Sequence, residues 1–244
     1  MGILNQTKLS VNINKLATIR NARGGNNPDI LLMAKKIESY GAHGITVHPR
    51  PDQRHIRFSD VYALKDILST EFNIEGYPSD DFIQMVLAIQ PAQVTLVPDP
   101  PDVLTSNAGW DTISNAEFLT EVIQTFKSKG IRTSIFLNPD PSMLDSAVKV
   151  GCDRIELYTE AFASAYHKNA HQAIAPYIET AKKAHELGLG INAGHDLDLH
   201  NLHFFASHVP GLLEVSIGHA LICDALEYGM SNTVKLYLNA LKLQ

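Results

Sequence analysis

Short apolar runs recur along this chain, and each is followed by a longer segment with a different period. Runs of four to eight residues rich in valine, isoleucine, leucine and phenylalanine are typical of buried strands. The sequence contains eight such runs, at 9–14, 44–49, 72–78, 93–98, 132–138, 154–159, 189–194 and 212–218. We predict that all eight are β-strands.

The segments between these runs have the period of amphipathic helices. Apolar residues recur at spacings of three and four in 29–41, 80–90, 116–130 and 173–188, which is the helical pattern. Gly41, Gly130 and Gly188 follow the last apolar turn, where glycine commonly ends a helix. Ser79 and Asp140 precede apolar segments and are good N-caps, so we expect helices to begin beside them.

Eight strand–helix units in 244 residues, with no break in composition, predict one closed barrel. We expect a single (β/α)8 TIM barrel over residues 1–244, with parallel strands and extra helical segments. An open dinucleotide-binding sheet is not favoured, because its glycine fingerprint is absent. In a barrel, the carboxyl ends of the strands form the functional face.

Composition narrows the class of protein further. The chain is 45% hydrophobic and 19% charged, with a formal net charge of −6, so it has ample core and is a poor partner for nucleic acid. No segment has the pattern of a signal peptide or a membrane span, and we expect a soluble, cytoplasmic protein. Cys152 and Cys223 are expected to be buried free thiols.

Polar residues stand where the predicted strands end. They are Asn12, Asn14, His48, Glu75, Thr95, Pro98, Asn138, Glu156, His195, Gly218 and His219. Because all eight strand ends share one rim of a barrel, these residues are expected to face a common pocket.

The segment GITVHPRPDQRHIR, after the second predicted strand, concentrates basic side chains. It contains His48, Arg50, Arg54, His55 and Arg57. Guanidinium forks match phosphate oxygens, and histidine can donate a hydrogen bond or move a proton near neutral pH. We interpret the segment as an anion clamp; the alternative is a solvated surface loop.

A second basic cluster follows the first strand. Lys15, Arg20 and Arg23 precede Gly24 and Gly25, and the glycine pair predicts a mobile loop that could fold over a ligand. The alternative is a flexible connection with solvated charge.

The last predicted strand offers another anion site. It ends at Gly218, before a helix that begins at His219, and free N–H groups at such a start bind phosphate. Gly194 and His195 stand beside it after the seventh strand. Two anion sites on one rim suggest two phosphorylated ligands or one bisphosphate.

Glu75 and Glu156 lie within otherwise apolar strands. Burial raises a carboxyl pKa, which suits a general acid or base; we take Glu75 as catalytic and Glu156 as supporting. The alternative is a core glutamate satisfied by an arginine. A metal site is not favoured, because no His-x-His or His-Glu-x-x-His pattern occurs and arginines are interleaved with the candidate ligands.

Seven segments in chain order resemble one family, the pyridoxine 5'-phosphate synthases. They are VNINKLATIRNARGG, GITVHPRPDQRHI, FNIEGYPS, LVPDPPDVLTSNAGWD, RIELYTE, INAGHDLDLHN and EVSIGHALI. The resemblance implies the condensation of 1-deoxy-D-xylulose 5-phosphate with 3-amino-2-oxopropyl phosphate to give pyridoxine 5'-phosphate, phosphate and water. It also implies no organic cofactor or metal, and a homo-oligomer, commonly an octamer.

The resemblance assigns roles to individual residues. His48 and Glu75 are implied to accept protons, and His195 to donate one. The residues implied to hold the sugar phosphate are Arg50, His55 and Thr105, and those implied to hold the amino-ketone phosphate are Asn12, Arg23, Gly218 and His219. Segments 99–114 and 160–169 are candidate lids.

The sequence departs from the family at substrate-binding positions. Asn14 and Lys15 stand where many members have an Asp-His pair, and Asp196 stands where glycine often follows the donor histidine. Lysine can pair with an anion but does not shuttle protons at its usual pKa. These changes leave open an inactive phosphate-ligand-binding barrel. Another phosphosugar barrel enzyme, such as an aldolase with Lys15 as the Schiff-base lysine, is a further alternative.

Overall fold

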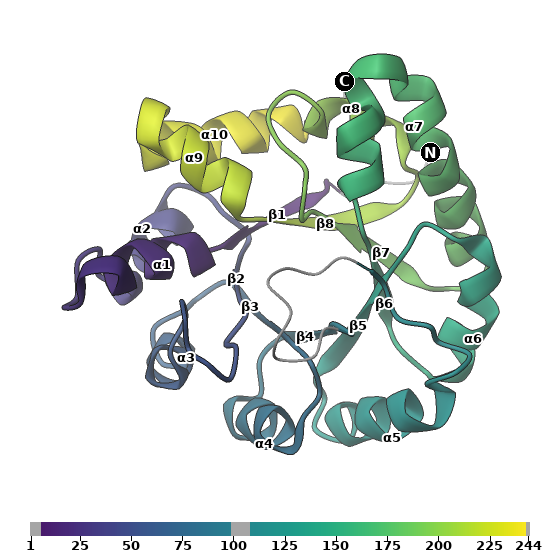
Figure 1. Cartoon of the computed structure of the whole chain (residues 1–244), viewed down its shortest axis with the longest axis horizontal. Helices are drawn as coiled ribbons and strands as arrows, with labels where there is room; N and C mark the ends of the chain where they lie inside the picture. The colour runs from purple at the N-terminus through teal and green to yellow at the C-terminus, as the bar shows by residue number, and fades with distance from the viewer. Residues whose placement is uncertain (1–5, 99–107, 243–244) are drawn as a thin grey trace.

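The computed structural model describes residues 6–98 and 108–242. Its strands form a closed barrel in the order β1 to β8, with every neighbouring pair parallel and β8 paired to β1 (Figure 1). The strands are β1 (Lys8–Asn12), β2 (Gly44–Val47), β3 (Glu71–Gly76), β4 (Gln93–Leu96), β5 (Arg132–Leu137), β6 (Arg154–Leu157), β7 (Gly190–Ala193) and β8 (Leu212–Ile217). All eight predicted strands and the TIM-barrel class are confirmed.

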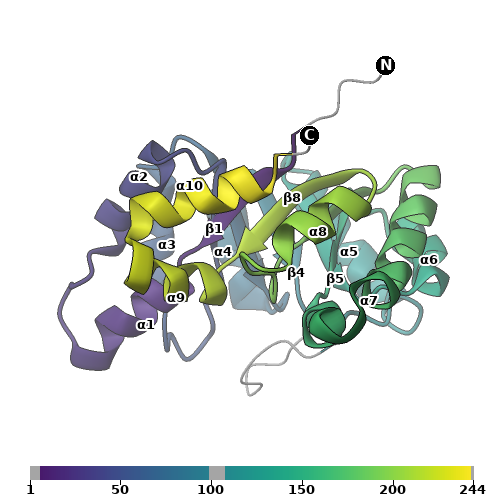
Figure 2. The ribbon, with the colours of Figure 1, turned by 90° about the horizontal axis from the view of Figure 1, so that it is seen from above.

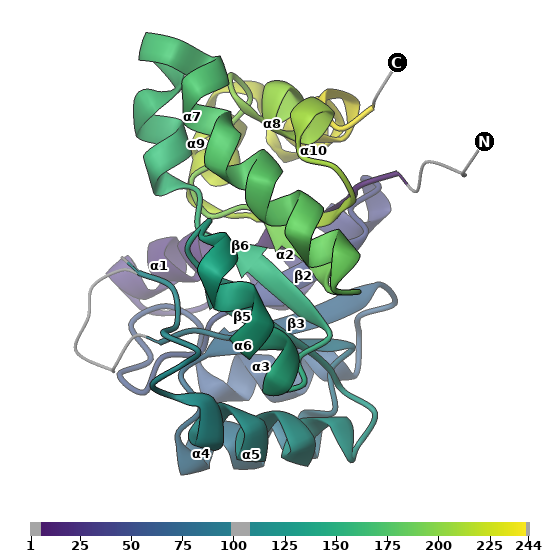
Figure 3. The ribbon, with the colours of Figure 1, turned by 90° about the vertical axis from the view of Figure 1, so that its right-hand side faces the viewer.

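Helices surround the barrel, with α4 and α5 on one side and α7 to α10 on the other (Figure 3). They are α1 (Asn14–Arg23), α2 (Ile30–Ser39), α3 (Phe58–Lys65), α4 (Asp80–Ile89), α5 (Ala116–Lys127), α6 (Leu144–Lys149), α7 (Glu160–Glu186), α8 (Leu202–His208), α9 (His219–Tyr228) and α10 (Met230–Ala240), with a 3-10 turn at Pro141–Met143. In the side view, α1 and α9 lie together at the end toward which the strands run (Figure 2).

Local capping explains where several elements begin and end. The Ser79 hydroxyl accepts a hydrogen bond from the backbone N–H of Phe82 at the start of α4, and the Asp140 carboxylate caps the turn before α6. Gly41, Gly130 and Gly188 have positive φ just after α2, α5 and α7. The predicted starts and stops at these positions are confirmed.

The barrel interior is polar. Thr95 of β4 donates to Asn73 of β3 (3.1 Å), and Asn73 donates to Thr46 of β2 (3.3 Å). Asn192 of β7 donates to Gln93 of β4 (3.3 Å), a bond that can only cross the interior because β4 and β7 are not neighbours. Barrel interiors are usually filled by branched aliphatic side chains. This barrel instead has a column of hydrogen-bonded polar side chains along its axis, which we call the polar column.

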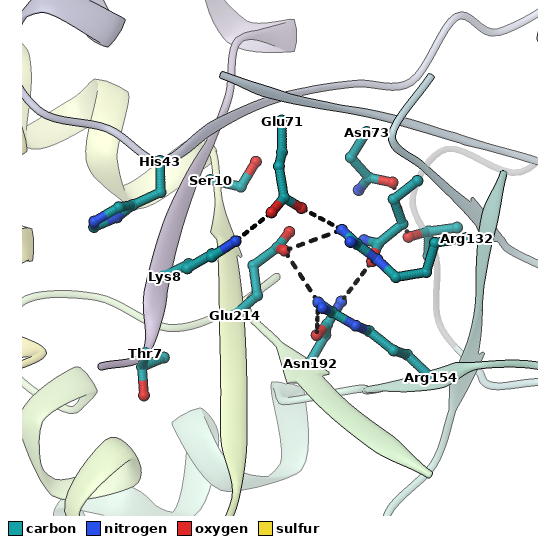
Figure 4. A network of polar contacts seen from close by, with 12 residues as sticks. Thr7, Lys8, Ser10, His43, Glu71, Asn73, Arg132, Arg154, Asn192 and Glu214 are labelled. Atoms are coloured by element: carbon teal, nitrogen blue, oxygen red, sulfur yellow. Dashed lines mark hydrogen bonds and ion pairs between the residues drawn. The ribbon is translucent and has the colours of Figure 1, made fainter. Parts of the chain in front are cut away.

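Ion pairs cross the N-terminal end of this column (Figure 4). Glu71 pairs with both Lys8 and Arg132, and Nη1 of Arg154 lies 3.3 Å from Oε2 of Glu214. Lys8, Glu71, Arg132 and Arg154 are all first residues of their strands. Glu214 belongs to β8, so the network ties five strands together at the end opposite to the functional face.

The prediction of a mobile loop after β1 is wrong for residues 14–23, which form helix α1; the non-helical segment begins at Gly24. Within α1, Arg20 is buried and forms two hydrogen bonds to the Asp60 carboxylate (2.7 and 2.9 Å). Arg20 therefore packs α1 against α3 and is not a solvated loop charge. Segment 160–169 forms the first part of α7, up to the non-helical Asn169.

The two cysteines differ. Cys152 is buried, as predicted, and burial raises its thiol pKa to about 12. Cys223 is exposed, one helical turn after His219 on α9, with its Sγ 3.7 Å from Nε2 of His219, so the prediction of a buried thiol is wrong there. Among the described residues, no helix has the length and apolar character needed to cross a membrane.

Candidate active site

A cavity of about 800 Å³ opens at the C-terminal ends of the strands. The sequence-predicted residues that line it are Asn12, Asn14, Lys15, His48, Arg50, Arg54, His55, Glu75, Glu156, His195, Asp196, Gly218 and His219. These residues come from the C-terminal ends of β1, β2, β3, β6, β7 and β8 and the segments that follow them, including the first turns of α1 and α9. The expectation that they face one pocket is confirmed for this set.

Asn12, the last residue of β1, organises one wall. Its side-chain amide donates to Oε2 of Glu75 (3.2 Å), and its Oδ1 accepts the backbone N–H of Asn14 (3.0 Å). Gly218 lies against it: a Cβ at position 218 would stand 3.0 Å from the Asn12 Cβ. Glycine therefore lets the start of α9 approach β1 closely.

His48 follows β2 and is held in place by its backbone. Its N–H donates to Oδ1 of Asn14 (3.0 Å). Burial, and then the positive charges of Arg50 and its neighbours, lower the His48 pKa well below its usual value. At neutral pH the imidazole is uncharged and can accept a proton.

His55 lies on the same loop in a defined tautomer. Its Nδ1 accepts the backbone N–H of Ile56 (2.9 Å), so Nε2 carries the proton and acts as a donor. Burial, followed by the Arg50 and Arg54 charges, lowers its pKa to about 4. Arg50 itself is buried at 5% exposure, which is the setting of a binding cation and not of a solvated loop charge.

Arg57 does not belong to the clamp. It stands at the start of α3, where its guanidinium donates to Oδ1 of Asn21 (3.1 Å), and it does not line the cavity. Of the residues predicted for the anion clamp, Arg50, Arg54 and His55 line the cavity. Arg57 does not, because its side chain joins α1 and α3.

Two carboxyl groups, those of Glu75 and Glu156, line the cavity. Glu75 accepts hydrogen bonds from Asn12 and from the Ser216 hydroxyl (3.4 Å), and burial raises its pKa to about 7. Burial, and then the Glu75 charge, raise the Glu156 pKa well above its usual value. Oε2 of Glu156 has no hydrogen-bond partner among the described residues. Burial thus favours the protonated form of Glu156, and Glu75, with a pKa of about 7, is poised between its two states at neutral pH.

His195 stands on a tight turn after β7. The N–H of Leu197 donates to the carbonyl of Gly194 (2.6 Å). A Cβ on Gly194 would lie 1.9 Å from the carbonyl oxygen of Ser216, so only glycine fits. The imidazole meets Phe136 and Tyr158 edge-on, with centroids 6.4 and 6.0 Å away.

Some predicted residues lie elsewhere. Thr95 is buried in the barrel column, Asn138 accepts the N–H of Gly109 (3.1 Å), and neither these nor Pro98 line the cavity. Arg23 is exposed at the end of α1 and outside the cavity. Thr105, and the part of the candidate lid up to residue 107, lie outside the described residues.

Other lining residues were not singled out from the sequence. They are Thr18, Val97, Phe136, Asp198, Ser216 and Ala220. Phe136 and Ser216 fall near the ends of predicted strands, so the alternation of inward and outward residues could have pointed to them. Within the described ranges, no group of three or more histidine, cysteine, aspartate or glutamate side chains is arranged to hold a metal ion.

The fold and the cavity define a class: a (β/α)8 barrel with basic and ionisable side chains gathered in a cavity at the C-terminal ends of its strands. The solved structure of 3-hexulose-6-phosphate synthase has the same fold, with a TM-score of 0.67 and 12% identity, covering 96% of this chain and 99% of that one.

Sequence comparison places the chain within that class. Residues 9–243 match the family model of the pyridoxal phosphate biosynthesis protein PdxJ. Pyridoxine 5'-phosphate synthase from Cytophaga hutchinsonii is 61% identical over 97% of this chain and 99% of its own length. The synthase from Bacteroides thetaiotaomicron is 59% identical over 97% of this chain and 100% of its own length. The chain belongs to the PdxJ family, and it is an enzyme of vitamin B6 biosynthesis.

Proposed function

We propose that this chain condenses 1-deoxy-D-xylulose 5-phosphate with 3-amino-2-oxopropyl phosphate to form pyridoxine 5'-phosphate, releasing inorganic phosphate and water. The observation that carries the proposal is the single cavity of about 800 Å³, which holds His48, Glu75 and His195 together with the basic side chains of the β2–α3 loop. That volume is within the range of sites that bind small organic ligands.

Binding of two phosphates is supported by two poles of the cavity. The β2–α3 loop supplies Arg50 and His55, which we assign to the sugar phosphate. The other pole is the start of the ten-residue helix α9, where Gly218 and His219 line the cavity. Unpaired N–H groups at a helix start favour phosphate, and we assign this pole, with Asn12, to the amino-ketone phosphate.

The chemistry needs repeated proton transfers. The amine of one substrate attacks the ketone of the other, and water leaves as the imine forms. Later enolisation, loss of phosphate and ring closure each move a proton. Neutral His48 and a Glu75 with a pKa of about 7 suit proton acceptance, and His195 supplies protons to departing oxygens.

No observation favours the two alternatives, an aldolase with Lys15 as the Schiff-base lysine and an inactive phosphate-binding barrel. Lys15 is exposed in the first turn of α1, whereas a Schiff-base lysine is activated by burial or by a neighbouring cation. An inactive binder would be expected where acid–base residues are lost, yet His48, Glu75 and His195 all line the cavity. Arg23 and Thr105 remain predicted substrate contacts that the described cavity does not include.

We also propose a cytoplasmic homo-octamer, on the strength of the family resemblance. Sedimentation analysis at micromolar concentration tests it. Eight copies of the 26.8 kDa chain are expected in one species, and a smaller species would reject the octamer without touching the catalytic proposal.

The catalytic proposal is tested by product formation. Purified, chelator-treated protein is incubated with both substrates, and pyridoxine 5'-phosphate is followed by absorbance and mass. Product is expected only when both substrates are present, together with one equivalent of phosphate. No product from a protein that binds both substrates would reject the proposal in favour of an inactive binder, and product only after metal is restored would reject the metal-free chemistry.

A further inference from the structure

The turn that carries His195 also carries a carboxylate. Asp196 follows His195 directly, and its backbone N–H donates to the hydroxyl of the fully buried Thr159 (3.0 Å). Gly194, on the other side of His195, is pressed against the backbone of β8. Both flanks of the turn are therefore fixed, so the backbone places the two side chains next to each other.

The Asp196 carboxylate meets the imidazole at one nitrogen. Oδ2 of Asp196 lies 3.0 Å from Nδ1 of His195. The two atoms are within ion-pair distance, although their alignment does not meet that of a hydrogen bond, and Oδ2 is buried with no hydrogen-bond partner among the described residues. A buried carboxylate oxygen is costly unless a positive charge faces it, so this arrangement favours the protonated imidazole.

Among the described residues, groups on three other elements also lie near His195. Glu75, from β3, is a second acidic group that interacts with His195. His48, from β2, is uncharged at neutral pH. Among the described residues, the ring also meets the edges of Phe136 and Tyr158. Asp196 places a carboxylate at ion-pair distance from the ring.

We propose that Asp196 is a positioning residue for the reaction: its carboxylate faces Nδ1 of His195, keeps the imidazole protonated, and leaves Nε2 to deliver the proton to the substrate. This inference rests on the proposed function, because it deepens the role of His195 as proton donor. The reacting proton belongs to His195; Asp196 acts only through that ring.

The negative charge of Asp196 is expected to change how kcat depends on pH. A carboxylate beside a histidine favours the charged ring and so raises its pKa. A proton donor is lost as pH rises through that pKa, so Asp196 extends activity toward alkaline pH. Replacing Asp196 by asparagine keeps the size and removes the charge, and should move the alkaline limit of kcat to lower pH by about one unit or more.

The test combines a spectroscopic titration with kinetics. Histidine-labelled protein is titrated by NMR, and the His195 signal is assigned by its loss in His195→Gln. The titration is compared in the wild type, Asp196→Asn and Asp196→Gly, which remove the carboxylate in different ways. Asp145→Asn, a change to an exposed carboxylate paired with Lys183, is the matched control. For each protein, kcat and both KM values are measured across pH.

The proposal predicts that both Asp196 variants lower the His195 pKa and shift the alkaline limb of kcat by the same amount, with KM values unchanged and Asp145→Asn like the wild type. An unmoved His195 titration, or a change in KM with kcat unchanged, would overturn it while the wild type remains active. A wild type that turns over neither substrate overturns the proposed function, and with it the role of Asp196 in proton delivery.

Discussion

At the scale of single residues, the site depends on ionisable groups placed in surroundings that change their pKa. The two strand glutamates show how much the sequence reveals: an acidic residue inside an apolar run predicts burial and a raised pKa. The structure gives a raised pKa for both, with Glu156 buried and Glu75 half-buried at the cavity. What the sequence could not reveal is the pairing. Glu75 is bonded to Asn12 and Ser216 and not to an arginine, because contacts across the barrel depend on register.

The Glu75 carboxyl predicts an acidic limit to activity. As a proton acceptor it must be ionised, and its pKa is raised to about 7, so kcat/KM should fall as pH drops below about 7. A pH profile of kcat/KM checks this. A profile that stays flat down to the usual glutamate pKa near 4 would mean that Glu75 is not the base.

Arg50 is predicted to bind the sugar phosphate. Its guanidinium is buried in the cavity wall, so Arg50→Ala should raise the KM for 1-deoxy-D-xylulose 5-phosphate by about 10- to 100-fold, as loss of a charge-assisted hydrogen bond does. The matched control is Arg57→Ala, from the same loop but outside the cavity, which should leave this KM near the wild-type value. An equal rise in both KM values for Arg50→Ala would argue against the division of the cavity into two phosphate poles.

At the scale of elements, the strands were predictable and one helix was not. Period-two and apolar runs located β1 to β8, although each predicted run extended one or two residues too far at its C-terminal end, where polar residues leave the sheet. Helix α1 was missed because it lacks a strong apolar face, and its only buried charge, Arg20, is neutralised by Asp60 on another helix. Such a tertiary ion pair leaves no periodic trace in the sequence.

The β7–α8 turn predicts a strict requirement for glycine. A Cβ at Gly194 would overlap the Ser216 carbonyl of β8, so Gly194→Ala should destabilise the protein by about 3 kcal/mol or more and displace His195. Gly130→Ala is the control, because no atom lies within 4 Å of its added Cβ and only its positive φ is unfavourable, at about 1 kcal/mol. Urea unfolding of both variants checks this; equal losses would mean that β8 can move aside.

At the scale of the whole molecule, the barrel has a polar axis with different ends. The N-terminal end is spanned by ion pairs (Figure 4), and the C-terminal end holds the cavity. The net charge of −6 does not reveal that the ion pairs and the cavity lie at opposite ends of the barrel, because the charged residues of the two ends are interleaved along the chain. The fold class could be predicted from the number of strand–helix units in the sequence. The polar interior could not, because its side chains meet only once the sheet has closed into a barrel.

The ion-pair network predicts how stability depends on pH. Hydrogen bonds from Lys8 and Arg132 lower the Glu71 pKa to about 2, despite the opposing effect of burial. Its stabilisation is therefore complete above the ordinary glutamate pKa near 4 and is lost as pH falls toward about 2. Glu71→Gln should lower Tm by about 2–4 °C at pH 7, with the difference shrinking below pH 4.

Calorimetry from pH 7 to pH 3 measures that difference directly. Asp145→Asn, which removes one exposed surface pair, should show little change at any pH. If the Tm difference for Glu71→Gln were constant across the range, the contribution of the network would come from packing and not from charge.

The central claim is that this cavity carries out the condensation by proton transfer, and the most direct measurement is turnover against binding in His195→Ala. Removal of a proton donor should lower kcat by about 10²- to 10⁴-fold, while the dissociation constant of each substrate, measured by calorimetry, stays near the wild-type value. His185→Ala, an exposed histidine near the end of α7, should match the wild type in both. A His195→Ala variant that retained wild-type kcat, or lost affinity for both substrates in proportion to its rate, would contradict the account.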